Sequence, residues 1–190
     1  PNPNDRPIPQ QLSILKIADR AIEDAKLERG ANVAVIVAME TEPTCHKVRT
    51  AYDLEWQVEA SLAQSNITLP PEKISEFKNI ISDTMLVKPM QVNQCLSFIG
   101  NIMASRISSL WDFSGPSFTL SAQENSTFKA LEVAQMLLAE NQVDAVVVGA
   151  VDLAGGVENV LLRQQMASIN TGKSTLSFDR NVNGWTVGEG

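Results

Sequence analysis

The fold is decided by residues 116–152, which read PSFTLSAQENSTFKALEVAQMLLAENQVDAVVVGAVD. The segment opens with a short predicted strand over 117–121 and closes with a continuous apolar strand over 144–152. Between them the spacing predicts a helix from Glu124 or Asn125 to about Asn141, whose core-facing side is expected to carry Phe128, Leu131, Ala134 and Leu138. A strand, a helix and a second strand form the crossover unit of a parallel sheet, so the predicted fold class is α/β.

The remaining elements extend this unit in both directions. Residues 32–39, NVAVIVAM, predict a buried parallel strand, because the run is β-branched, apolar on both faces and too short for a helix. The sequence predicts further helices from Pro9 to about Gly30, over 52–64, over 71–86 and over 92–112. We interpret residues 40–92 as an insertion over the sheet, within a single domain that spans 1–190.

Composition excludes several classes of protein. Fifteen basic and 22 acidic residues give a formal net charge of −7 without a basic stripe, which disfavours binding to nucleic acid or to an anionic membrane. No apolar run approaches the ~20 residues that a membrane span needs. Two distant cysteines, Cys45 and Cys95, fit a reducing compartment, so a cytoplasmic domain is expected. The glycine-rich end, Val187 to Gly190, predicts a fragment of a larger polypeptide.

The junction at 120–126, LSAQENS, is where a parallel α/β protein would hold a reactive group. A strand ends there, and the positive end of a helix dipole points at the turn. The position holds no evident nucleophile, because the Gln123 amide does not attack a carbonyl and the chain has one histidine, the distant His46. The favoured interpretation from the residues alone is that Ser121 or Asn125 caps the helix, with Glu124 in its first turn.

Two other polar positions have competing interpretations. His46 beside Cys45 suggests a metal pair, but adjacent side chains rarely face one ion, so we predict no metal site and place both residues in a surface loop. Arg106, within an apolar helix, has the chemistry to bind a phosphate or carboxylate. An ion pair within a buried helix interface is the favoured interpretation of this arginine.

Two blocks of the sequence resemble the nucleophile half of a β-ketoacyl synthase of the thiolase superfamily. The first block contains Ser105–Ser108 (SRIS), Gly115–Ser117 (GPS), Ser121-Ala122 and the strand over 144–152, and the second is FDRNVNGWTVGEG at 178–190. Residues 18–39 are similar to the family's first helix and strand. The resemblance implies the N-terminal half of a layered α/β/α/β/α fold, in which two similar halves stack around a central helix pair. It also implies that Asp179 and Glu189 hold turns and backbone N–H groups rather than form a pair of catalytic carboxylates.

The sequence departs from the family pattern at the nucleophile. The family's cysteine falls on Gln123 and the serine after it on Glu124, so the acyl-enzyme of the condensation reaction is not available. Ser121, Ala122 and Glu124 are the predicted binding residues around this altered position. The family's catalytic histidines belong to its C-terminal half.

The resemblance is most specific to ketosynthase-like regions of multidomain bacterial polyunsaturated fatty acid synthases, among whose subunits the acyltransferase-bearing one is favoured. It implies a non-condensing, chain-length-factor-like domain that positions acyl chains or acyl carrier protein. The partners would be acyl carrier protein, with its phosphopantetheine as the substrate arm, and other synthase domains; no cofactor is expected to bind directly. The alternatives are a glutamine-type decarboxylase of malonyl-acyl carrier protein, which Glu124 disfavours because a carboxylate opposes an enolate, and a synthase or acyltransferase active only within the full polypeptide.

The strand before the turn is the predicted dimer edge. Ser117, Thr119 and Ser121 alternate with Phe118 and Leu120, so one face of this strand is expected to be less deeply buried than the all-apolar strands. An open edge recruits a partner strand, and the resemblance implies the same strand of a second subunit, antiparallel about a two-fold axis. The alternative is an edge covered by another part of the parent protein.

Overall fold

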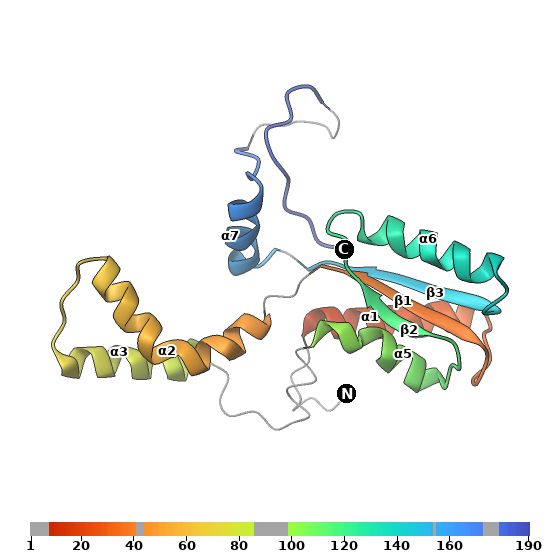
Figure 1. Ribbon diagram of the computed structural model, residues 1–190, viewed down its shortest axis with the longest axis horizontal. Helices are drawn as coiled ribbons and strands as arrows, with labels where there is room; N and C mark the ends of the chain where they lie inside the picture. The colour runs from red at the N-terminus through yellow and green to blue at the C-terminus, as the bar shows by residue number, and fades with distance from the viewer. Residues whose placement is uncertain (1–7, 41–43, 86–98, 154, 173–178) are drawn as a thin grey trace. The chain divides into compact units, whose positions relative to one another are not determined.

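The computed structural model describes residues 8–40, 44–85, 99–153, 155–172 and 179–190, and Figure 1 shows their elements. Contacts between Cα atoms divide the chain into two compact units. One unit, here called the helical unit, contains α2 (Thr44–Gln64) and α3 (Pro71–Met85). The other, the sheet unit, contains the strands and the remaining helices.

The sheet has three parallel strands with β1 (Val33–Met39) at its centre. β2 (Ser117–Leu120) pairs with one edge of β1 and β3 (Ala145–Val151) with the other. Every residue of β1 is buried, as its unbroken apolar sequence predicts. β3 is also apolar throughout, yet most of it is only half-buried, because it is an outer strand of the described sheet.

Helices cover both faces of this sheet, which confirms the α/β class. In Figure 1, α1 (Pro9–Asp24) and α5 (Met103–Trp111) lie on one face, and α6 (Ser126–Ala139) lies on the other. α6 links β2 to β3 across β1, which is the predicted crossover. A shorter helix, α7 (Val157–Met166), follows β3. Because the strands are parallel, their carboxyl ends lie along one edge of the sheet, where ligands bind in open α/β folds.

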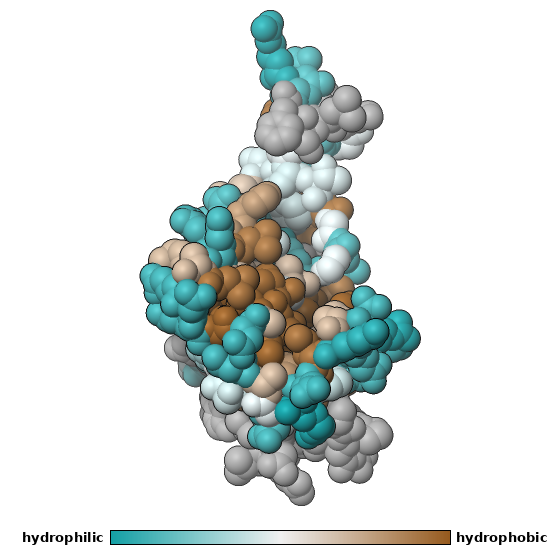
Figure 2. All heavy atoms as spheres, turned by 90° about the vertical axis from the view of Figure 1, so that its right-hand side faces the viewer, coloured by the Kyte–Doolittle hydropathy of each residue, from teal (hydrophilic) through white to brown (hydrophobic). Residues whose placement is uncertain are grey.

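The face through which α6 packs on the sheet shares only Ala134 with the predicted one. Ala130 and Ala134 are buried against β1, whereas Phe128 and Leu131 are 71% and 52% exposed and Leu138 is exposed as well. The prediction was right for Ala134 and wrong for Phe128, Leu131 and Leu138, because α6 has two apolar faces and the small alanines, not the large residues, allow the close approach to the strands. Figure 2 shows hydrophobic residues gathered, inside a hydrophilic border, on the side of the molecule where α6 and the sheet lie.

Helix ends differ from the predicted ones in an informative way. α1 ends at Asp24, before the predicted stop at Gly30. Lys26 takes the left-handed conformation (φ 55°), and the Leu27 N–H donates to the Ile22 carbonyl at 3.2 Å, which closes the helix without a glycine. The helix predicted over 92–112 is described from Ile99 onward, as a 3-10 turn (Gly100–Ile102) followed by α5; Cys95 lies outside the described residues.

The two helices predicted in the 40–92 segment both form. α2 begins at Thr44, so Cys45 and His46 lie in its first turn, and the predicted surface loop was wrong. The side chains of these two residues are outside the described part of the chain. Within the described residues, no helix combines the length and the apolar character needed to cross a membrane.

We expect Gly115→Ala to lower the free energy of unfolding by about 1–3 kcal/mol, the usual cost of forcing extra atoms into a packed region. A Cβ at this position would lie 2.5 Å from the carbonyl oxygen of Val33 and 2.8 Å from the amide nitrogen of Ala34, so the central strand itself would have to move. Urea unfolding followed by circular dichroism measures the effect. The control is Gly188→Ala, which meets nothing within 4 Å and should change stability by less than about 0.5 kcal/mol. Equal stabilities for the two variants would contradict this packing.

Candidate functional site

The turn between β2 and α6 holds Gln123 in a strained conformation. Gln123 has φ 53°, in the left-handed region that side chains other than glycine seldom adopt. Four other non-glycine residues in the described part of the chain share this conformation, and each follows the end of a helix: Lys26, Asn66, Asp112 and Asn141. Gln123 alone among the five precedes a helix. Strain at such a position points to a functional role, because the surrounding structure must maintain it.

Ser126 maintains this turn. Its hydroxyl accepts the Ala122 N–H at 2.8 Å and donates to the Gln123 carbonyl at 2.5 Å, and the residue is only 5% exposed. The Ser126 N–H also donates to the Gln123 carbonyl, at 3.0 Å. A single buried serine therefore binds the backbone on both sides of the strained residue.

The predicted helix cap was wrong. Asn125 occupies the position before α6, but its side chain makes no capping hydrogen bond, and Ser121 is exposed. Ser126 was missed because capping rules look at the residue before the helix, whereas this hydroxyl reaches back from the first helical residue. A serine three residues after a potential left-handed position is the local signal that could have identified it.

A pocket of about 690 Å³ lies beside Gln123, within the sheet unit. Gln123 and Glu124 line it, as does Thr127 of α6, whereas the predicted binding residues Ser121 and Ala122 are outside its lining. The ends of β1 and β3 contribute Ala38, Met39, Glu40, Ala150, Val151 and Asp152, and the other walls include Arg163, Met166, Ala167, Trp185, Thr186 and Gly190. The pocket is therefore at the carboxyl edge of the sheet, and its strand-end walls are largely apolar.

An ionic cluster forms one wall of the pocket. Arg163, on α7, donates to both carboxylate oxygens of Asp152 at 3.0 Å and also pairs with Glu40. Its guanidinium lies 5.8 Å from the ring centroid of Trp185. Sequence reasoning missed this cluster, although Glu40 and Asp152 each follow an apolar strand directly and parallel strands end at the same edge.

The closing segment of the chain returns to this edge. Asp152 and Gly190 exchange backbone hydrogen bonds of 2.7 and 2.8 Å, and Figure 1 marks the C-terminal end beside the turn before α6. Glu189 accepts the Gly155 N–H at 2.9 Å, and Asp179 accepts the Asn181 N–H at 2.8 Å. The structural role expected for both carboxylates is confirmed. Phe178 lies outside the described residues.

Arg106 has a different partner from the expected carboxylate. Its guanidinium donates to the Gln11 side-chain oxygen at 2.7 Å, and Gln11 is fully buried on α1. No ion pair of Arg106 is found among the described residues, so the predicted buried ion pair was wrong. A neutral amide suits a partly buried site because it satisfies the guanidinium without burying a second charge.

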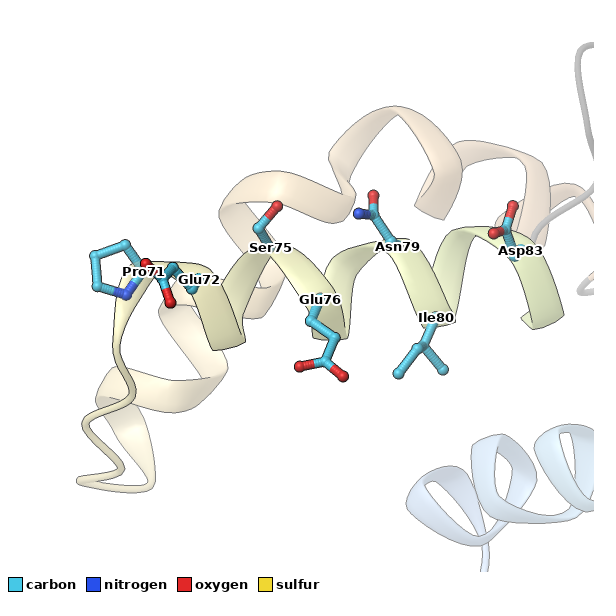
Figure 3. A pocket seen from close by; sticks show the side chains of 7 residues that line it. All are labelled: Pro71, Glu72, Ser75, Glu76, Asn79, Ile80 and Asp83. Carbon is cyan, nitrogen blue, oxygen red and sulfur yellow. The ribbon is translucent and has the colours of Figure 1, made fainter.

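A second hollow, of about 830 Å³, runs along α3 in the helical unit. Figure 3 shows that its lining side chains come from one helix and point to different sides, with Glu76 and Ile80 opposite Asn79. Side chains that diverge in this way do not assemble a reacting centre. In the described part of the chain, no group of three histidine, cysteine or acidic residues is placed to hold a metal ion.

We expect Ser126→Ala to lower the free energy of unfolding by about 1–3 kcal/mol, because it removes a buried hydroxyl and leaves the Ala122 N–H without its acceptor. Chemical denaturation measures the loss. The matched control is Ser121→Ala, whose side chain is exposed in the same turn and whose loss should cost less than about 0.5 kcal/mol. A tolerated Ser126→Ala variant would show that the turn does not depend on this hydroxyl.

Comparisons with known proteins identify the family of the chain. Residues 3–190 match the model of the β-ketoacyl synthase N-terminal domain. The chain is 34% identical to a polyunsaturated fatty acid synthase subunit of Thraustochytrium sp., over 99% of this chain and 9% of that protein. It is 29% identical to the highly reducing polyketide synthase dmxL2 of Cryptosporiopsis sp., over 62% of this chain and 5% of that protein.

A solved structure described as PfaC keto synthase-chain length factor is 49% identical and superposes with a TM-score of 0.69, over 83% of this chain and 17% of that one. The chain thus spans about a tenth of the first relative and a sixth of this structure. The family match and the superposition confirm the predicted thiolase-like class of α/β fold. The chain belongs to the β-ketoacyl synthase family, and it corresponds to the N-terminal domain of that family.

Proposed function

We propose that this chain is a non-condensing, chain-length-factor-like ketosynthase domain that positions acyl chains or acyl carrier protein in polyunsaturated fatty acid biosynthesis. The proposal rests on Gln123, which holds the strained turn position where the family pattern has its cysteine. A carboxamide does not form the acyl-enzyme on which condensation depends. The chain therefore has the fold of a condensing enzyme but lacks the nucleophile of the condensation reaction.

The pocket beside Gln123 has the size and lining expected of a site for an acyl group. Its volume of about 690 Å³ lies within the range of small-molecule sites, and Met39, Val151 and Met166 give it apolar walls. In this family the acyl group arrives on the phosphopantetheine arm of an acyl carrier protein. We infer that the same arm reaches this pocket, and that carrier protein and other synthase domains are the partners.

The named relatives support this assignment. The similar structure is described as a keto synthase-chain length factor, and a similar protein is one of the subunits of a polyunsaturated fatty acid synthase. An acyltransferase-bearing subunit stays a prediction, since these names do not mention one. A cytoplasmic location likewise stays a prediction, based on the cysteine content, and so does the division of the chain into one domain with an insertion over 40–92.

A decarboxylase is the second candidate, because the Gln123 amide lines the pocket and amide N–H groups stabilise developing negative charge. Glu124 lines the same pocket, and its carboxylate would oppose an enolate. This acidic neighbour favours the positioning role. A synthase or acyltransferase that is active only within a larger polypeptide is the third alternative.

We expect the chain to show no covalent acylation and no condensation when it is incubated with acyl- and malonyl-carrier thioesters, as followed by mass spectrometry. Gln123→Cys places a thiol at a helix N-terminus, so iodoacetamide should label it faster than Cys95. This variant should still form no condensation product, because the added thiol lacks a general acid–base partner. Acyl transfer to Gln123, Ser121 or Ser126 at a catalytic rate would contradict the proposal.

We also propose that Ser117, Phe118, Thr119 and Leu120 form the edge through which two copies of the chain pair. The Val35 N–H donates to the Pro116 carbonyl at 2.9 Å, with Val35 opposite Ser117. Alternate residues of a parallel strand bond to the same neighbour, so the Phe118 amide faces β1 and the Thr119 amide faces the open edge. No strand among the described residues pairs with this side of β2, and such an edge is a template for another strand.

Thr119→Pro should therefore convert a dimer into a monomer with little loss of helical circular dichroism, because it deletes a donor on the outer side of β2. Phe118→Pro is the contrasting variant: it deletes a donor directed at β1 and should destabilise the fold itself. Sedimentation measures the first effect and urea unfolding the second. A monomeric unmodified chain, or an unchanged dimer in Thr119→Pro, would exclude this edge as the interface.

A further inference from the structure

The side chains that line the pocket beside Gln123 carry an excess of negative charge. Three of them are carboxylates, on Glu40, Glu124 and Asp152, and one is a guanidinium, on Arg163. Three negative charges and one positive charge leave a net charge of −2. The other lining side chains are uncharged. Whether the pocket attracts an anionic ligand therefore depends on whether Arg163 is available to bind it.

Arg163 is already engaged by protein groups. Both oxygens of Asp152 accept from one of its terminal nitrogens, Glu40 pairs with the same nitrogen, and the Trp185 ring lies against the guanidinium. The Arg163 side chain is only 27% exposed. Two carboxylates already offset the charge of Arg163, so an incoming anion would meet a cluster with a net charge of −1, and Arg163 is a poor anchor for it.

The start of α6 is the other source of positive potential at the pocket. A helix N-terminus is equivalent to about half a unit charge, which is less than the excess on the side chains. The turn also uses some of its backbone donors internally. The Asn125 N–H donates to the Ala122 carbonyl at 3.2 Å, and the Ser126 N–H donates to the Gln123 carbonyl. The carboxylates therefore dominate the potential.

We propose that this pocket selects acyl groups by charge, accepting neutral ones and repelling those that end in a carboxylate, such as malonyl thioesters. Glu40, Glu124 and Asp152 are its specificity-determining residues. The inference rests on the proposed function, since it assumes that acyl groups enter this pocket. In a water-like dielectric, one uncompensated charge at about 7 Å disfavours a like charge about threefold, and two such charges about tenfold.

A reporter thiol tests the charge directly. Gln123→Cys is made with Cys45→Ser and Cys95→Ser, on a chain with a neutral extension after Gly190 so that no terminal carboxylate adds to the pocket. Alkylation rates are measured with neutral iodoacetamide and with anionic iodoacetate. The rate with iodoacetamide is divided by the rate with iodoacetate, and this ratio is then divided by the same ratio measured in urea. This quotient removes the reactivity of the thiol itself, because both reagents attack the same thiolate. We expect a quotient of about three to ten that falls toward one in 1 M salt.

Matched variants assign the effect to residues. Glu124→Gln and Glu40→Gln should each lower the quotient about threefold. Glu23→Gln, on the exposed side of α1 and near the amino end of β1, removes the same charge far from the pocket and should leave the quotient unchanged. A quotient of one, or a quotient that Glu124→Gln and Glu40→Gln do not change, would overturn the proposal.

A second experiment measures ligand binding to the chain that retains Gln123, and it tests the proposal even if the reporter variant does not fold. Acetoacetyl- and malonyl-pantetheine have similar shapes, and the second alone carries a charge. Calorimetry should show at least threefold tighter binding of the acetoacetyl thioester, and Glu124→Gln should narrow the difference. Equal or tighter binding of the malonyl thioester would overturn the charge selection. If neither thioester binds, the proposed function fails on this chain, and the thiol quotient alone decides whether the pocket repels anions.

Discussion

The complete burial of β1 is the constraint on which the rest of the structure depends. A strand with apolar residues on both faces needs a helix layer on each side, and its backbone needs a hydrogen-bonded neighbour at each edge. β2 and β3 supply the edges, while α6 on one face and α5 on the other supply the layers. Because all three strands are parallel, their ends bring Glu40, Ser121 and Asp152 to one side of the sheet. The position of the pocket follows from this single buried strand.

The elements that could be predicted from the sequence are those with one dominant signal. β1 has seven apolar residues in a row, and its bounds agree with the predicted 32–39 to within one residue. The strand, helix and strand predicted within 117–152 also form. The face of α6 could be predicted only in part: Ala134 was expected to face the core, but Phe128 and Leu131 give a stronger hydrophobic signal than Ala130. Which apolar face of α6 packs on the sheet depends on how closely the helix backbone approaches the strands. The spacing of apolar residues in the sequence does not predict that distance.

The candidate site was predictable only in part for a related reason. Gln123 and Glu124 could be placed at the strand–helix turn because local patterns mark such a junction. The cluster of Glu40, Asp152 and Arg163 joins positions up to 123 residues apart, and each of the three is an ordinary charged residue in its own segment. Only the parallel order of the strands brings the two carboxylates together, and only the position of α7 adds the arginine. Ser126 was missed because its two bonds run back into the turn.

The two apolar faces of α6 also determine the distance between the sheet and any layer that packs on the other side of this helix. The face with Ala130 and Ala134 seats the helix against the sheet, and the face with Phe128 and Leu131 is available to whatever covers it. Any layer that covers this second face is separated from the sheet by the thickness of one helix, roughly 10 Å. Gln123 lies in the turn that leads into this helix. α6 therefore acts as a spacer that sets how far any covering layer lies from the sheet.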